Sequence, residues 1–150
     1  MSPNRSILAG LLWPLGLFAT PSYQTTPPTA AVGNGSYSGS YLGGGLDVNQ
    51  YLGIKYANAP RFARPTALNE TWEGSRNATQ FGYSCVQVAL FGAANQGEDC
   101  LNLNVWQPSG TAPSASLPVL LWIYGGGLVG GSASSPLYNM SQIVQTSINM

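Results

Sequence analysis

The segment Leu117–Ser132 (LPVLLWIYGGGLVGGS) constrains the fold more than any other part of the chain. Val119–Ile123 is an unbroken run of β-branched, aliphatic and aromatic residues, with a proline before it and three glycines after it. Such a run predicts a strand buried on both faces, as in a parallel sheet covered by helices. The glycines at Gly125–Gly127 remove every Cβ from the turn that follows, so the backbone can adopt positive φ there and bring its N–H groups close to a ligand atom. The segment therefore predicts a strand that ends in an anion-binding turn.

The glycine turn allows three interpretations. One is a plain turn, because short motifs produce false positives. The second is dinucleotide binding, since Gly125, Gly127 and Gly130 fit G-x-G-x-x-G, but that site needs a helix at once and an acidic residue about twenty positions later. Pro136 delays the helix, and no Asp or Glu follows Asp99. The third is an oxyanion hole of the HGGG type, which follows a strand and donates backbone N–H groups to a tetrahedral intermediate. The context favours the third interpretation.

Composition limits the function classes. Charged residues make up 7% of the chain, against roughly 25% in a typical soluble domain, and five positive charges cancel five negative ones. This balance gives no electrostatic basis for binding nucleic acid or an anionic membrane. The 150 residues contain no histidine, so a Ser-His-acid triad cannot be completed within them. The length suffices for one domain and one core but is short for an α/β enzyme with a full sheet.

The N-terminus has the pattern of a secretory signal. Arg5 supplies a positive charge, and the apolar run Ile7–Ala19 is too short and too interrupted to span a bilayer, which needs about 20 residues. The alternative, a buried N-terminal helix, is disfavoured because Pro14 lies in its middle. We expect a secreted protein without a transmembrane segment. The predicted organisation is a signal peptide at 1–22, a Pro/Thr-rich tether at 23–31 and a domain over 32–150.

Secretion predicts an oxidising environment, and Cys85 and Cys100 are the only cysteines. A bridge between them would close a loop of about fifteen residues and contribute about 3 kcal/mol; the alternative is two free buried thiols. Four triplets have the N-x-[ST] form of glycosylation sites and agree with the secretory route. They begin at Asn34, Asn69, Asn77 and Asn139.

The middle of the chain alternates short predicted strands with turns. Gly35–Ser40 and Gln50–Tyr56 are expected to form an antiparallel hairpin joined through the flexible Leu42–Asp47. Leu101–Trp106 (LNLNVW) alternates apolar and polar residues and predicts a further strand. From Leu137 onward, apolar residues recur near helical spacing, which predicts a helix packed on the sheet.

Several segments together resemble one family, the type-B carboxylesterases and lipases of the α/β-hydrolase fold, whose relatives include the cholinesterases. Their order and spacing match the family from about Val32 to the last residue, and the set is most similar to secreted fungal members. The resemblance implies an α/β fold in which an antiparallel N-terminal hairpin leads into a mostly parallel central sheet. The segments are GSYSG (35–39), YLGIKYANAP (51–60), RFARP (61–65), WEGSRNAT (72–79), EDCLNLNVW (98–106) and LPVLLWIYGGG (117–127).

The resemblance also implies roles for individual residues. Gly126 and Gly127 would donate the oxyanion-hole N–H groups, with Gly125 shaping the turn. Tyr124 stands where many carboxylesterases have His and cholinesterase-like members have Tyr, and Leu128 replaces the usual Phe. The two cysteines match a disulfide of the family.

The sequence departs from the family in lacking a nucleophile. The nearest string to G-x-S-x-G, Gly130–Ser134, lacks the closing glycine and does not follow a strand directly, so Ser132 and Ser134 are poor candidates. We therefore expect an N-terminal fragment of an ester hydrolase that provides the oxyanion loop but no triad residue, with no metal or cofactor, in a full-length protein that acts on small-molecule or lipid esters. The alternatives are a non-catalytic family member that acts as an interaction module, a pseudogene product, or a small secreted binding protein. An unfinished sheet disfavours the last.

Overall fold

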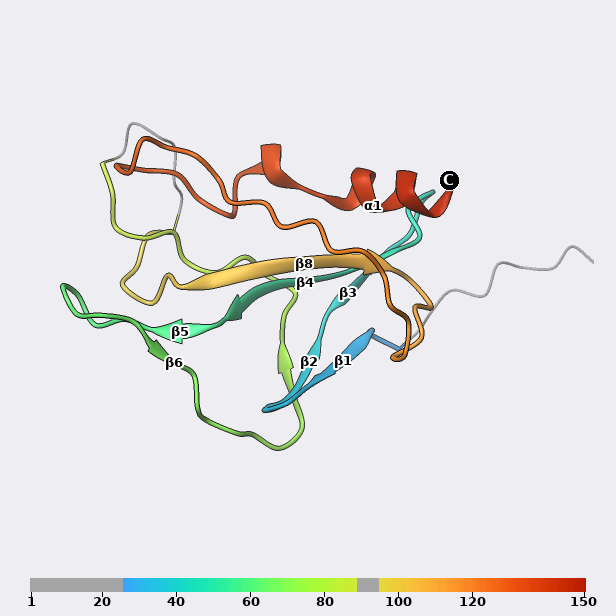
Figure 1. The fold of residues 1–150 in the computed structure, drawn as a ribbon, viewed down its shortest axis with the longest axis horizontal. Coiled ribbons are helices and arrows are strands. Elements are labelled where there is room, and N and C mark those ends of the chain that lie inside the picture. Colours follow the sequence, from blue (N-terminus) through green and yellow to red (C-terminus); the bar gives the residue numbers. More distant parts are fainter. Residues whose placement is uncertain (1–25, 89–94) are drawn as a thin grey trace, which may run out of the picture.

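The computed structural model describes residues 26–88 and 95–150. The predicted signal peptide and the first residues of the predicted tether lie outside the described residues. Within the described part of the chain, short strands form small sheets, and a 3-10 helix and one α-helix follow near the C-terminus (Figure 1). The elements are β1 (Thr29–Val32), β2 (Gly35–Ser38), β3 (Ser40–Leu42), β4 (Val48–Lys55), β5 (Ala57–Asn58), β6 (Thr66–Ala67), β7 (Ser75–Asn77), β8 (Asn102–Pro108), a 3-10 helix (Pro136–Tyr138) and α1 (Ser141–Ile148).

The first sheet has the order β1-β2-β7. β1 and β2 pair antiparallel in a tight hairpin that opposes Val32 to Gly35, and β7 pairs parallel with β2. The end of the predicted tether is thus corrected, because residues 29–31 belong to β1. The segment reads as Pro/Thr-rich and patternless on its own, but Ala30 lies opposite Tyr37 and packs against the core.

The second sheet has the order β3-β4-β8 and is antiparallel throughout. It contains part of the predicted hairpin: Ser40 pairs with Gln50, and the loop between the strands is residues 43–47, whereas Leu42, which was expected in the loop, belongs to β3. The prediction was wrong for Gly35–Ser38, which pairs with β1 instead. The strand predicted at Leu101–Trp106 is confirmed as β8, but its partner in the described chain is the antiparallel β4 and not a parallel neighbour.

A small core joins the two sheets. Tyr37 of β2, Tyr51 of β4 and Ala78 pack together, with Trp72 at their side. The peptide of Ala78 bridges the sheets, because its N–H donates to Ser38 (2.8 Å) and its carbonyl accepts from Leu52 (2.7 Å). The indole of Trp72 contacts the Tyr37 ring edge-on, with 5.3 Å between ring centroids.

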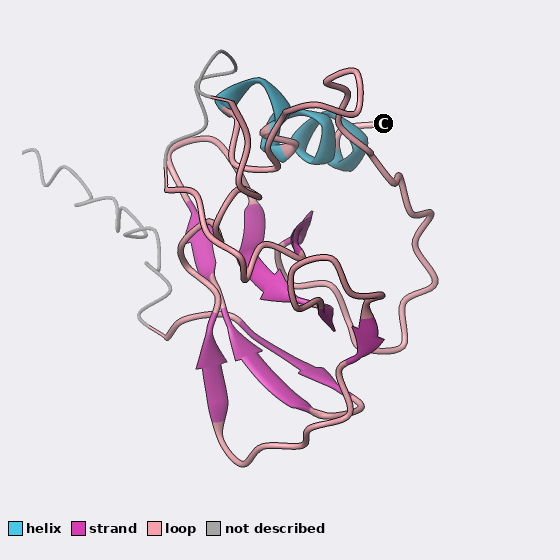
Figure 2. Cartoon of the chain, turned by 90° about the vertical axis from the view of Figure 1, so that its left-hand side faces the viewer, coloured by secondary structure: helices cyan, strands magenta, loops and turns pink. Residues whose placement is uncertain are grey.

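The helix predicted after Leu137 is confirmed as α1. The Asn139 side chain, just before the helix, accepts the N–H of Ser141, the first helical residue (3.0 Å). α1 lies against β8 and β4, and Figures 1 and 2 both show it across one side of these strands. Gln145 of α1 accepts the backbone N–H of Asp47 (2.6 Å), which ties the helix to the loop before β4. None of the described helices has the length and apolar character needed to cross a membrane.

The strand predicted at Val119–Ile123 is wrong for this structure. These residues form no strand, and their side chains are between 56% and 91% exposed. A strand buried on both faces requires hydrogen-bonded neighbours at its edges and packed layers on its faces. The described residues supply neither at this segment, so a strongly apolar run forms no strand and stays exposed.

Candidate functional site

The glycine loop, defined here as Tyr124–Gly131, turns the chain back on itself directly after the apolar run. The carbonyl of Gly126 accepts the N–H groups of Val129 (3.1 Å) and Gly130 (3.2 Å), which closes a tight turn. Gly126 has φ 146° and Gly127 has φ 62°, conformations in which a side chain is rarely tolerated. The positive φ expected for these glycines is therefore present.

The two ends of the glycine loop meet in a narrow neck. A Cβ placed on Gly126 would overlap the carbonyl oxygen of Gly130. A Cβ on Gly131 would lie 2.5 Å from the carbonyl oxygen of Gly125 and 2.8 Å from the ring of Tyr124. Real Cβ atoms do not approach neighbours so closely, so the neck can form only from residues without side chains.

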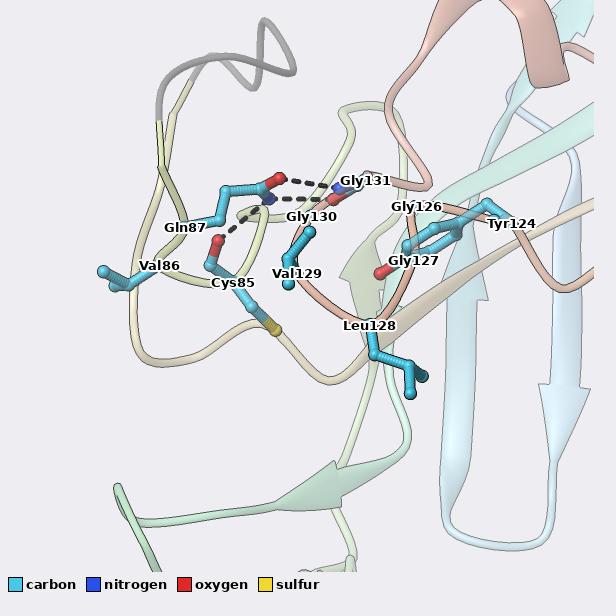
Figure 3. Close-up of a pocket in the computed structure, with 11 residues that line it drawn as sticks. Cys85, Val86, Gln87, Tyr124, Gly126, Gly127, Leu128, Val129, Gly130 and Gly131 are labelled. Atoms are coloured by element: carbon cyan, nitrogen blue, oxygen red, sulfur yellow. Dashed lines mark hydrogen bonds between the residues drawn. The ribbon is translucent and has the colours of Figure 1, made fainter.

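The glycine loop offers unpaired backbone donors. Within the part of the chain that the structure describes, no hydrogen bond uses the N–H groups of Gly126 or Gly127. The loop borders an open pocket of about 450 Å³, whose opposite wall is residues 85–87 (Figure 3). Free N–H groups on bare backbone beside an open pocket are suited to binding an oxyanion.

Gln87 holds the neck from outside the loop. Its Oε1 accepts the N–H of Gly131 (2.6 Å), and its Nε2 donates to the carbonyl of the same residue (2.8 Å), as Figure 3 shows. Nε2 also donates to the carbonyl of Cys85 (3.1 Å). Sequence reasoning missed this residue, because its partner lies 44 positions away and a lone glutamine matches no motif.

Ser132 and Ser134 are structural in this arrangement. The buried hydroxyls of Ser84 and Ser132 lie 2.6 Å apart, and Ser132 is also 2.6 Å from the hydroxyl of Ser134. The backbone N–H of Ser134 donates to Ser132 as well (3.0 Å). A nucleophile needs an adjacent base and an open approach, and no histidine exists in the sequence. In this structure both hydroxyls are therefore engaged with neighbouring polar groups.

Aromatic contacts fix the start of the loop. The ring of Tyr124 stacks on Tyr138, with 6.4 Å between ring centroids, and Trp122 lies 5.8 Å from the same ring. Tyr124 therefore packs between the 3-10 helix and Gly131. In the middle of the loop, Leu128 has φ 63° and its side chain is fully exposed beside the pocket.

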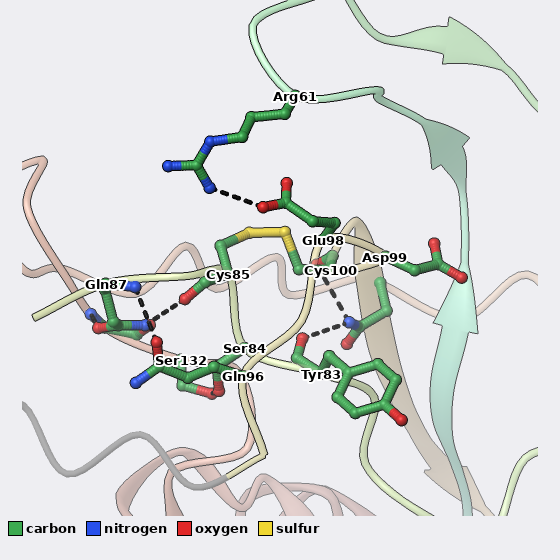
Figure 4. The surroundings of a disulfide bond; sticks show 12 residues. Arg61, Tyr83, Ser84, Cys85, Gln87, Gln96, Glu98, Asp99, Cys100 and Ser132 are labelled. Atoms are coloured by element: carbon green, nitrogen blue, oxygen red, sulfur yellow. Dashed lines mark hydrogen bonds and ion pairs between the residues drawn. A yellow bond between two sulfur atoms is a disulfide. The ribbon is translucent and has the colours of Figure 1, made fainter. Parts of the chain in front are cut away.

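The predicted disulfide between Cys85 and Cys100 is present (Figure 4). Two ion pairs flank it: Arg61 contacts Glu98 (2.6 Å), and Lys55 contacts Asp99 (2.7 Å). Both pairs are substantially exposed, so each contributes about 1 kcal/mol or less. The disulfide is thus the strong link that holds residues 85–87 in place beside the glycine loop.

The four predicted glycosylation sites differ in their surroundings. The side chains of Asn69, Asn77 and Asn139 are exposed, whereas Asn34 is half-buried. Both hydrogens of the Asn34 amide are used, because Nδ2 donates to the carbonyls of Leu68 (3.2 Å) and Glu70 (3.0 Å). Among the described residues, no group of three or more His, Cys, Asp or Glu side chains is placed to hold a metal ion.

Comparison with known proteins extends this description. The sequence pattern of the carboxylesterase family matches residues 26–149. The chain is 35% identical over 142 residues to the fumonisin B1 esterase of Sphingopyxis macrogoltabida, covering 89% of this chain and 26% of that protein. It is also 35% identical over 151 residues to lipase 4 of Diutina rugosa, covering 82% of this chain and 26% of that protein.

Solved structures agree with these relatives. A PNB esterase structure superposes with a TM-score of 0.66 at 36% identity, covering 79% of this chain and 24% of that one. A thermophilic PNB esterase gives 0.67 at 35% identity, covering 79% and 25%. The chain therefore has the architecture of part of an α/β-hydrolase and spans about a quarter of the length of the relatives it matches.

Proposed function

Because this chain belongs to the carboxylesterase family, we propose that its glycine loop is the oxyanion hole of a serine ester hydrolase. The observation that carries the proposal is the pair of unpaired N–H groups at Gly126 and Gly127, on side-chain-free backbone at the edge of an open pocket. Tyr124 and Gly125 support the loop by packing against Gly131.

The loop acts when negative charge develops on the substrate. A serine hydroxyl attacks the ester carbonyl, a histidine takes its proton and returns it to the leaving alkoxide, and the carbonyl oxygen becomes an oxyanion. The amides of Gly126 and Gly127 donate to that oxygen, and each such donor is worth about 10²–10³ in kcat. We propose that these residues are the N-terminal part of a longer polypeptide that supplies the serine, the histidine and the acid.

The substrate class follows from the site's composition. Among the residues that the structure describes, no charged side chain lines the pocket, whose walls are the glycine loop and residues 85–87. The exposed Leu128 next to the free amides suits an apolar acyl or alcohol group. We therefore propose a neutral small-molecule or lipid ester as substrate.

We also propose that the protein is secreted and of the fungal type. The Cys85–Cys100 disulfide supports an oxidising compartment. The signal-like N-terminus and the sequons at exposed Asn69, Asn77 and Asn139 support the same route.

The test uses the complete polypeptide that carries these residues, secreted from a eukaryotic host. We expect it to hydrolyse p-nitrophenyl butyrate and to lose that activity when one equivalent of diisopropyl fluorophosphate forms a covalent adduct with a serine. A folded protein that shows neither turnover nor an adduct would refute the proposal and favour the non-catalytic interaction module.

A further inference from the structure

We propose that Gln87 is a positioning residue, which sets the geometry of the glycine loop by clamping the backbone of Gly131. The catalytic consequence of this inference rests on the proposed function, whereas its structural part does not. Gln87 contacts the loop from the far side of the pocket, beside the Cys85–Cys100 disulfide (Figures 3 and 4).

The clamp uses both ends of one amide on one residue. Oε1 accepts from the Gly131 N–H at 2.6 Å while Nε2 donates to the Gly131 carbonyl at 2.8 Å. A neighbouring strand would make the same two-bond exchange with Gly131 in an antiparallel sheet. The side chain of Gln87 therefore replaces a strand neighbour and fixes both the position and the orientation of that peptide segment.

The position of Gly131 influences that of the N–H groups of Gly126 and Gly127. Gly131 packs directly on the carbonyl of Gly125 and on the ring of Tyr124, and Gly130 donates to the carbonyl of Gly126. The neck has no side chains that would allow it to adjust. A shift of Gly131 is therefore transmitted to the peptides that carry the N–H groups of Gly126 and Gly127.

The clamp is itself anchored. The backbone N–H of Gln87 donates to the side chain of Gln96 (2.8 Å), and its Nε2 donates to the carbonyl of Cys85. The disulfide fixes Cys85, and Ser84 bonds to Ser132 immediately after the loop. Residues 84–87 thus hold both sides of residues 131–132, so the clamp is part of a rigid support and not a chance contact of one exposed side chain.

The chemistry of the clamp requires a group that donates and accepts at once. An amide does both at every pH, whereas an ionised carboxylate only accepts and a protonated carboxyl again does both. In Gln87→Glu one carboxylate oxygen still accepts the N–H of Gly131, while the other faces the carbonyls of Gly131 and Cys85 and has no hydrogen to donate until the carboxyl is protonated. Lowering the pH then restores the donor.

The kinetic test compares the complete wild-type polypeptide with Gln87→Glu and Gln87→Leu. At pH 8 we expect kcat for p-nitrophenyl butyrate to fall about 100-fold in both variants, because misplacing a catalytic group by about 1 Å has an effect of this size. KM should change little, since an oxyanion hole acts in the transition state. As the pH falls to 5, the ratio of Gln87→Glu to wild-type kcat should rise at least tenfold, while the ratio for Gln87→Leu should stay constant.

Gln142→Glu provides the matched control, because it makes the same chemical change on the exposed face of α1 and should retain wild-type kcat. Equal kcat in wild type and Gln87→Leu, or a pH-independent ratio for Gln87→Glu, would overturn the positioning role.

Hydrogen exchange tests the clamp without relying on activity. In Gln87→Leu, peptides that cover 124–132 should exchange at least tenfold faster, while those that cover β4 should be unchanged. Unchanged exchange in the loop would refute the clamp even if the protein is active. If wild type has no esterase activity but the loop exchange responds as expected, the clamp stands and only the proposed function fails.

Discussion

At the scale of residues, the candidate site consists of backbone. Gly126 and Gly127 contribute N–H groups and no side chain, and the shape of the loop depends on the absence of Cβ atoms. Composition and motif therefore predicted the loop well, since only glycine satisfies such a neck. The supporting side chain of Gln87 was not predictable, because a long-range contact leaves no local pattern.

Glycosylation should occur at three of the four sequons and not at Asn34, because the side-chain amide of Asn34 already donates both of its hydrogens. Attachment of a glycan replaces one hydrogen of Nδ2, and Asn34 already donates both, to Leu68 and Glu70. We expect peptide mass spectrometry of the secreted protein to find glycans on Asn69, Asn77 and Asn139 and an unmodified Asn34. A glycan on Asn34 in a protein that retains the β1–β2 hairpin would contradict this prediction.

Tyr51 should make the fold sensitive to alkali. Its side chain is buried in the core, and burial raises the pKa of the phenol above its ordinary value of 10.0. In the unfolded chain the phenol ionises first, so the native state binds more protons between the two pKa values and stability falls as the pH rises through that window. We expect the melting temperature of the wild type to fall more steeply than that of Tyr51→Phe between pH 9 and 11. Parallel profiles would contradict this.

At the scale of elements, the disulfide should carry more stability than the ion pairs that flank it. Closing the separation of 15 residues between Cys85 and Cys100 should contribute about 3 kcal/mol. The free energy of unfolding of the double variant Cys85→Ser/Cys100→Ser, measured by denaturant titration, should be lower than that of the wild type by this amount. A reductant should destabilise the wild type to the same extent and leave the variant unchanged. A wild type that is insensitive to reductant would show that the bridge contributes little.

The elements that were predicted correctly are those whose structure follows from the residue pattern of the element itself. β8 alternates apolar and polar residues, and the apolar residues of α1 recur near helical spacing. β1 was missed because Thr29–Val32 gains its strand character only from pairing with β2. The pattern of Val119–Ile123 predicted burial, and burial depends on neighbours that the described residues do not provide.

At the scale of the whole molecule, the exposed apolar run and the greater length of the relatives both agree with the proposed longer polypeptide. The chain spans about a quarter of the length of its relatives, and the segment that leads into the glycine loop is the most apolar uncovered stretch among the described residues. The donors of the proposed oxyanion hole therefore lie next to a surface suited to packing, which agrees with the proposed longer polypeptide.

The most direct test of the proposed oxyanion hole is kcat for p-nitrophenyl butyrate in the complete polypeptide carrying Gly126→Ala. The added Cβ overlaps the carbonyl oxygen of Gly130, so the neck cannot close as it does here, and we expect kcat to fall about 10²–10³-fold. Gly33→Ala adds the same methyl group where no atom lies within 4 Å and should retain wild-type kcat. Equal kcat in Gly126→Ala and Gly33→Ala would contradict the assignment of the glycine loop as the oxyanion hole.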